Sequence, residues 1–415
     1  MNKSLHLVRS TGVVLCNVVS LLALAASASA LAQSNAGGSP TNIGVITPLS
    51  PPGDPAAGQL IVRGAELGAR FANERIGPSW NKACSLPGPI NIVKGDDAGL
   101  PEKGLAAFRS LSSNNVAGIL GSYDSSVALA VQPLAEQSKV PMMITQASAD
   151  KLSGNHAAYT FQTHTLASDR SDVVERFVIT YKFKRVAILA ENTDYGTTSG
   201  PDMQKRFERA GIASQLWIFD RANPDLLGTL LQVKKFAPDA IYNMGVGAPA
   251  YLLVKQSADV GLLPKTPMII SYDLPIRPEF WQNVGDLGKN IIFLSYYQPK
   301  QVLTEAGKWM QDEYQKMYKE PPMYGSFAAF GNTILLAQAM NAACSTDGEA
   351  VAKALRTAKL TNWNQQNVTF PQKEGVDWQR TVQPIMVLQY TKPRQPFGDA
   401  TILYPLEMKT GEVQR

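Results

Sequence analysis

Short apolar runs alternate with amphipathic stretches along most of this chain, and no other feature of the sequence constrains the fold as strongly. The apolar runs predict strands at 43–47, 90–93, 116–120, 141–145, 185–190, 214–218, 240–244, 267–270 and 291–295. The stretches between them predict helices at 58–75, 102–112, 127–137, 169–181, 197–210, 225–236 and 249–260. Strands and helices that alternate in this way form parallel sheets with helices on both faces, so the predicted fold class is α/β.

A polar connection near residue 160 divides this alternation into two series. Each series has the length of a common domain, and together they predict two doubly wound lobes. Beyond residue 300 the pattern changes to helices at 305–319, 325–343 and 348–358, followed by a strand at 385–389. The tail is punctuated by proline and glycine and contains no repeat.

The first 32 residues have the layout of an export signal. Lys3 and Arg9 form a basic start, an apolar stretch covers 13–26, and Ala30 and Ala32 fit the small-residue pattern for cleavage after Ala32. A membrane anchor is the alternative, but the apolar stretch is short for a span of the bilayer. We therefore expect a periplasmic protein whose signal peptide is cleaved near Ala32.

Removal of the signal leaves a nearly balanced charge, because Lys+Arg falls from 39 to 37 while Asp+Glu stays at 34, a net charge of about +3. No basic run stands out, so nucleic acid is not an expected partner. Cys84 and Cys344 remain, and in an oxidising compartment they form either a disulfide or two separate buried thiols. His156 and His164 lack zinc-ligand spacing, so neither a metal nor a cofactor is expected.

The loops that follow strands are the candidate binding loops, because ligands of doubly wound sheets bind beyond the carboxyl ends of the strands. After the strand at 116–120, Ser125 and Ser126 open a helix, where hydroxyls and free backbone N–H groups can bind a small carboxylate. An ordinary helix N-cap is the alternative role. The next strand runs into 145–148, which carries further hydroxyls, and two such adjacent strand ends favour the carboxylate site.

In the second series, Tyr195 follows a strand and can close over a ligand, or pack flat on its own lobe. Asp273 also follows a strand and can accept a hydrogen bond from a ligand ammonium, or cap the turn that follows it. The loop 245–250 matches G-x-G-x-x-A, a dinucleotide-binding pattern, but the export signal argues against a nicotinamide cofactor. Other catalytic motifs are missing, so an enzyme is not expected.

Several segments, in this order and spacing, resemble the substrate-binding proteins of branched-chain amino-acid ABC transporters, the leucine/isoleucine/valine-binding family of type I periplasmic binding proteins. The segments are 43–50, 63–67, 121–130, 140–144, 185–189 and 194–196, and the resemblance runs from about residue 42 to residue 389. It implies two α/β lobes joined by three crossovers. The first lobe would hold 42–160 and 291–362, and the second 161–290 and 363–415. Cys84 and Cys344 would then both lie on the first lobe, which favours their disulfide.

The resemblance also implies a set of ligand contacts shared by the two lobes: Ser125, Ser126, Ala147, Ser148, Tyr195, Asp273 and Tyr324. Hydroxyl and N–H donors of the first lobe would bind the ligand carboxylate, and the end of the next strand would contact both carboxylate and ammonium. From the second lobe, the tyrosine would cover the ligand and the aspartate would face its ammonium. Tyr324 would lie near a pocket aromatic of the family.

The function implied by the resemblance is that of a receptor. It would capture a small amino acid or a related carboxylate by closure of the two lobes, and deliver it to the membrane permease of an ABC importer. Such a receptor is a monomer. Members of the family also bind aromatic carboxylates, amides or urea, and the same fold serves ligand-sensing regulatory proteins, so these alternatives stay open.

Overall fold

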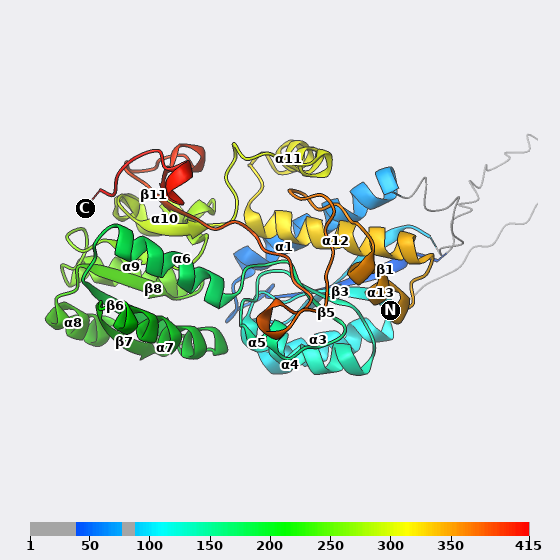
Figure 1. Cartoon of the computed structure of the whole chain (residues 1–415), viewed down its shortest axis with the longest axis horizontal. Helices are drawn as coiled ribbons and strands as arrows, with labels where there is room; N and C mark the ends of the chain where they lie inside the picture. The colour runs from blue at the N-terminus through cyan, green and yellow to red at the C-terminus, as the bar shows by residue number, and fades with distance from the viewer. Residues whose placement is uncertain (1–38, 77–87, 415) are drawn as a thin grey trace, which may run out of the picture. The chain divides into compact units, whose positions relative to one another are not determined.

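Two sheets covered by helices make up the described part of the chain, residues 39–76 and 88–414 of a computed structural model (Figure 1). The first sheet has five strands in the order β2-β1-β3-β4-β5, and all its neighbours pair in parallel. Its strands are β1 (Thr41–Thr47), β2 (Ile90–Asp96), β3 (Val116–Leu120), β4 (Met142–Ile144) and β5 (Thr160–Gln162). We call this sheet and the helices that cover it the first lobe.

The helices of the first lobe come from both halves of the sequence. They are α1 (Pro55–Phe71), α3 (Pro101–Ser113), α4 (Ser125–Gln137), α5 (Lys151–Gly154), α11 (Glu305–Tyr318), α12 (Tyr324–Ala343) and α13 (Gly348–Thr357). Helix α12 is apolar all round and almost wholly buried, as expected of a helix surrounded by other elements. It lies beside α1, and Gly64 makes this close approach feasible, because a Cβ there would stand 2.1 Å from the carbonyl oxygen of Ser326 (Figure 1).

The second sheet has seven strands in the order β12-β11-β10-β9-β8-β6-β7, and we call it with its helices the second lobe. Its strands are β6 (Arg185–Glu191), β7 (Ala213–Phe219), β8 (Ala240–Met244), β9 (Met268–Ile270), β10 (Ile292–Ser295), β11 (Met386–Gln389) and β12 (Thr401–Tyr404). Strand β11 pairs antiparallel with both of its neighbours, β10 and β12, and the other pairs of this sheet are parallel. The helices are α6 (Ala167–Thr180), α7 (Asp194–Arg209), α8 (Leu227–Phe236), α9 (Ala248–Asp259) and α10 (Phe280–Val284).

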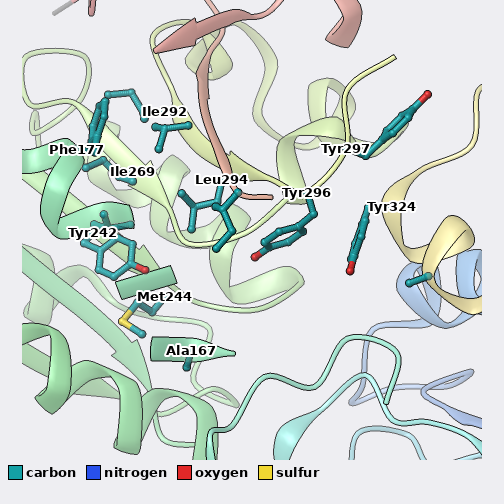
Figure 2. Close-up of a cluster of buried hydrophobic side chains, with 14 of the residues drawn as sticks. Ala167, Phe177, Tyr242, Met244, Ile269, Ile292, Leu294, Tyr296, Tyr297 and Tyr324 are labelled. Carbon is teal, nitrogen blue, oxygen red and sulfur yellow. The ribbon is translucent and has the colours of Figure 1, made fainter. Parts of the chain in front are cut away.

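A buried cluster extends from the second sheet toward α12 (Figure 2). Tyr242 and Met244 of β8 and Leu294 of β10 belong to it, and it continues through Tyr296 to Tyr324 at the start of α12. The rings of these last two tyrosines lie 4.9 Å apart between centroids. Elements assigned to different lobes therefore share one continuous region of apolar packing.

The predicted α/β class is confirmed, and the predicted strands and long helices are all present, with β3 and β8 at the predicted bounds. Strands β5 and β12 were not predicted. They contain only three and four residues, too few to show a period along the sequence.

The chain passes between the lobes three times, after β5, after β10 and before β11. The positions of two crossings differ from the expected boundaries. Residues 291–295 were expected in the first lobe, but β10 pairs with β9 and β11 in the second sheet, where its apolar side chains are all buried. Arg380 still forms a bridge with Gln162 of β5, so the tail rejoins the second lobe only at β11.

Two predictions fall on residues outside the described ranges. The export signal and its cleavage near Ala32 lie in 1–38, and Cys84 lies in 77–87. Cys344 directly follows α12. Because Cys84 lies outside the described residues, the disulfide between the two cysteines stays a prediction. Among the helices of 39–76 and 88–414, none is long and apolar enough to cross a membrane.

Candidate functional site

A cavity of about 40 Å³ lies at the carboxyl ends of the strands, where the packing of a doubly wound sheet leads us to expect a ligand. Fifteen residues line it, and they come from both lobes. Since one water needs about 10–15 Å³, the cavity has room for only a few such groups in this conformation. Its lining combines charged and hydroxyl side chains with four tyrosines, and Val246 is the single aliphatic side chain.

Five of the seven predicted contact residues line this cavity together: Ser125, Ser126, Ser148, Tyr195 and Asp273. The other two lie just behind the wall. Ala147 is buried, and its carbonyl accepts a hydrogen bond from Gln162 Nε2. Tyr324 is also buried, and its hydroxyl lies 2.9 Å from Nδ1 of His164, a residue of the cavity wall.

Ser125 occupies the first position of α4, at the edge of the cavity. Its Oγ accepts hydrogen bonds from the backbone N–H groups of Ser148 and Ala149, both at 3.2 Å. These bonds tie the start of α4 to the loop after β4 and occupy two amides of that loop. The hydroxyl hydrogen of Ser125 is still able to donate to a ligand, because the oxygen acts only as an acceptor in these bonds.

The second lobe contributes Tyr195 and Asp273 from its own strand ends. Tyr195 lies in the first turn of α7, and its hydroxyl donates to Ser271 Oγ at 2.9 Å. Asp273 follows β9 and is 4% exposed. Burial raises the pKa of its carboxyl group, and the charges of Arg277 and Arg170 partly oppose that shift. The site therefore presents a buried acid opposite the hydroxyls of the first lobe.

Arg170 of α6 and His164 line the same cavity, and the sequence analysis missed both as contact residues. The guanidinium of Arg170 lies over the rings of Tyr195 and Tyr296, 5.6 and 5.4 Å from their centroids, and donates to His164 Nε2. Burial and the charge of Arg170 hold the pKa of His164 well below its usual value, so the ring is neutral. Since Nε2 accepts, Nδ1 carries the proton and donates to Tyr324.

A signal for Arg170 was present in the sequence. The buried positions of α6 include 167, 170, 171, 174, 177 and 178, which is the spacing of one helix face. Arg170 is the only charged residue in that stripe. A charged residue inside an otherwise apolar face is the pattern that marks a buried functional group.

Two ion pairs join the lobes beside the cavity. Arg277 of the second lobe donates to Asp54 at 2.6 Å and to the hydroxyl of Tyr123 at 2.8 Å. Arg221 donates to Asp124 at 2.7 Å. Burial would raise the pKa of Asp54, but the charge and hydrogen bond of Arg277 outweigh it and keep that pKa below its ordinary value. These pairs hold the two lobes against each other in the observed conformation.

Glu191, at the end of β6, is a second acidic group of the cavity wall. It accepts hydrogen bonds from the Val246 N–H and the Thr193 hydroxyl, both at 2.9 Å, and lies 4.0 Å from Arg221. Burial raises its pKa to about 7 despite these partners. Its charge therefore changes near neutral pH.

The loop 245–250 connects β8 to α9, as a dinucleotide-binding loop would. The N–H of Gly247, however, donates to the hydroxyl of Tyr272 at 2.7 Å, and a Cβ on Gly247 would lie 3.0 Å from Asp54. This amide and the space beside it are therefore occupied by protein groups. In residues 39–76 and 88–414, no group of three or more His, Cys, Asp or Glu side chains is arranged to hold a metal.

Comparison with known proteins adds to this geometry. The sequence matches the family model described as periplasmic binding protein over residues 40–394. A protein of Brucella abortus (strain 2308), named Leu/Ile/Val-binding protein homolog 2, is 25% identical over 317 residues, which are 76% of this chain and 81% of that protein.

Two solved structures share the fold. The branched-chain amino acid transporter substrate binding protein LivJ of Streptococcus pneumoniae, solved with isoleucine, has a TM-score of 0.73 and 20% identity over 88% of this chain and 100% of that chain. An ABC transporter solute binding protein of R. palustris, solved with benzoate, has a TM-score of 0.71 and 18% identity over 88% of this chain and 96% of that chain. The bound molecules of these two proteins differ in chemical class.

Proposed function

Because this chain belongs to the periplasmic binding protein family, in its branched-chain amino-acid type, we propose that it is the extracytoplasmic receptor of an ABC importer and captures a small amino acid or a related carboxylate. The observation that carries the proposal is the composition of the cavity wall. Hydroxyls of Ser125 and Ser148 come from the first lobe, and Tyr195 and Asp273 come from the second. A ligand that contacts both sets stabilises the closed arrangement of the lobes.

Capture works through closure of the two lobes. When the lobes separate, both sets of polar groups face water, and a ligand can bind to either wall. Closure surrounds the ligand and forms the ion pairs of Arg277 with Asp54 and of Arg221 with Asp124. A ligand shifts the equilibrium only by its difference in affinity for the two states, and contacts from both lobes supply that difference.

The proposal also covers the export of the protein and its mature form outside the cytoplasm. The signal peptide of residues 1–32 directs export and is cleaved near Ala32. The mature receptor is a monomer stabilised by a disulfide between Cys84 and Cys344, and it delivers its ligand to a membrane permease.

A thermal-shift screen tests the proposal. The mature chain, from Gln33, is unfolded and refolded to remove bound molecules, and then mixed with amino acids, aromatic carboxylates, amides and urea. Binding to the native state alone stabilises it by about 2.7 kcal/mol at a hundredfold excess over the dissociation constant, a shift of a few degrees for a chain of this size. A chain that no member of the panel stabilises would not be this receptor.

A second candidate ligand class is aromatic carboxylates. The R. palustris neighbour was solved with benzoate, and four tyrosines line the present cavity: Tyr123, Tyr195, Tyr272 and Tyr296. Tyrosine rings can pack on an aromatic ligand while their hydroxyls bind its carboxylate. A shift with benzoate and none with amino acids would favour this class.

A further inference from the structure

Three arginines lie at or beside the cavity, and one of them, Arg170, differs from Arg221 and Arg277 because no carboxylate forms an ion pair with it in the described part of the chain. Arg277 and Arg221 each lie within 3 Å of a carboxylate oxygen, at 2.6 Å from Asp54 and 2.7 Å from Asp124. Arg170 is 5% exposed, yet in residues 39–76 and 88–414 no carboxylate forms an ion pair with it. Its contacts are with His164, Thr165 and the faces of tyrosine rings.

Arg170 therefore has no carboxylate of the described residues in ion-pair contact, and its charge acts on Asp273 only over a longer distance. A guanidinium has five N–H donors and no acceptor, and it stays protonated in proteins. Thr165 is at the limit of hydrogen-bond distance, at 3.5 Å, and neutral His164 accepts a single bond. Buried charges are normally paired, because burial without a partner is strongly unfavourable. The free side of this guanidinium lines the cavity, so an anion bound there would complete the pair.

Several backbone amides near the cavity already have hydrogen-bond acceptors in the protein. The N–H groups of Ser148 and Ala149 already donate to Ser125 Oγ. The N–H of Asp194, at the start of α7, donates to Ser126 Oγ at 3.4 Å. Arg170 is the only arginine or lysine among the residues that line the cavity, so it offers charge-assisted hydrogen bonds to an anion there.

The rest of the wall limits the side chain of the ligand. Gln146, Asp124 and Glu191 line the cavity together with the predicted contact residues, and Val246 is the one aliphatic member of the wall. The tyrosine rings give the wall apolar area as well, but its buried carboxyl, amide and hydroxyl groups need polar partners, which a ligand hydroxyl supplies and an aliphatic side chain does not.

Resting on the proposed function, we infer that Arg170 binds the ligand carboxylate and that the ligand is a small polar amino acid rather than a branched-chain one. Arg170 supplies the charge-assisted donors, neutral His164 holds the guanidinium in place, and Asp273 on the opposite side faces the ammonium. His164 is a positioning residue, because it acts through Arg170. The inference departs from the ligand class printed for the Brucella relative and for LivJ.

The test compares four ligands that differ by one group each. Isothermal titration calorimetry on the refolded mature chain uses L-serine, L-alanine, L-alaninamide, which lacks the carboxylate, and L-leucine. We expect L-serine to bind at least tenfold tighter than L-leucine. We expect L-alaninamide to bind at least 100-fold more weakly than L-alanine, as loss of a charged hydrogen-bonded contact implies.

Variants then assign the carboxylate contact to Arg170. Arg170→Gln should weaken L-serine binding at least 100-fold, and Arg170→Lys, which keeps the charge, should weaken it less. The matched control is Arg206→Gln, because Arg206 of α7 pairs with Asp202 at 2.7 Å and does not line the cavity. It should leave the dissociation constant within twofold of the wild-type value. A circular-dichroism melt without ligand establishes that each variant is folded.

The outcomes separate this inference from the proposed function. Unchanged affinity in folded Arg170→Gln, or equal affinity for L-alanine and L-alaninamide, overturns the carboxylate contact while the receptor function stands. Tighter binding of L-leucine than of L-serine overturns the ligand class. If Arg170→Gln does not fold, the test rests on three measurements: L-alanine against L-alaninamide and L-serine against L-leucine on the wild type, and L-serine on Arg170→Lys. If none of the panel of amino acids, acids and amides binds the wild type, the proposed function itself fails.

Discussion

Arg277 offers the sharpest test of lobe closure, because it contributes to the closed form without lining the cavity. Its side chain is 4% exposed and that of Asp54 is 8% exposed, and the two lie on different lobes. The change Arg277→Met removes the guanidinium at similar length and leaves the carboxylate of Asp54 buried. In the open form this carboxylate would face water, so the penalty falls on the closed form.

The size of the effect follows from the burial of the pair. Removing one partner of a buried ion pair destabilises the structure by about 3–5 kcal/mol. The hydroxyl of Tyr123, which donates to Asp54 at 3.4 Å, partly compensates, so we take about 3 kcal/mol. At about 1.4 kcal/mol for each factor of ten, the dissociation constant of the ligand should rise about 100-fold. Titration calorimetry with the ligand found by the thermal-shift screen measures this directly.

The double variant Asp54→Asn with Arg277→Met is the control. It removes both charges, and asparagine can still cap α1, where Asp54 Oδ1 accepts from the Ala57 N–H at 3.2 Å. Its affinity should return to within about tenfold of the wild-type value, since no buried charge is left alone. The reasoning is refuted if Arg277→Met binds within threefold of wild type, or if the double variant binds as weakly as the single one.

Three further predictions concern stability, each measured by urea unfolding. Because burial raises the pKa of Glu191 from 4.5 to about 7, the folded state holds its proton more tightly, and the free energy of unfolding should fall as pH rises through that window. For the Glu191→Gln variant, the free energy of unfolding should fall less between pH 5 and pH 8 than it does for the wild type. An equal fall in both proteins would contradict the raised pKa of Glu191. Gly64→Ala should lower the free energy of unfolding by about 1–3 kcal/mol, because the new Cβ overpacks against Ser326. Gly228→Ala is the control: this exposed position in α8 has no atom within 4 Å of the new Cβ, so the free energy of unfolding should rise by about 0.5–1 kcal/mol. Arg170→Met without ligand should leave the free energy of unfolding unchanged or higher, because no carboxylate loses an ion-pair partner. A fall of about 3 kcal/mol or more would argue against an unpaired Arg170.

Much of the candidate site was predictable because it lies on strand ends. Apolar runs mark the strands of a parallel sheet, and the residues that follow them must meet at one edge. This rule pointed to Ser125, the loop 145–148, Tyr195 and Asp273, with capping or packing roles left open, and the family resemblance then named Ser148; the structure brings the four residues into one cavity. Arg170 was missed because a charged residue in an amphipathic helix is usually assigned to the exposed face.

The sequence by itself determined the α/β class, the order of the strands along the chain and several of the loops that line the cavity. These depend on periodicity and on residues that are near neighbours in the chain. Only the tertiary structure decided which sheet takes β10 and which charges meet across the lobes. Asp54 and Arg277 are separated by 223 positions, and β10 pairs with β11 through a connection of 90 residues, 296–385. Several charged residues and strands could have paired in other ways, and the pairs that form are those that the packing of the whole chain buries together. The local sequence around each residue does not specify its distant partner.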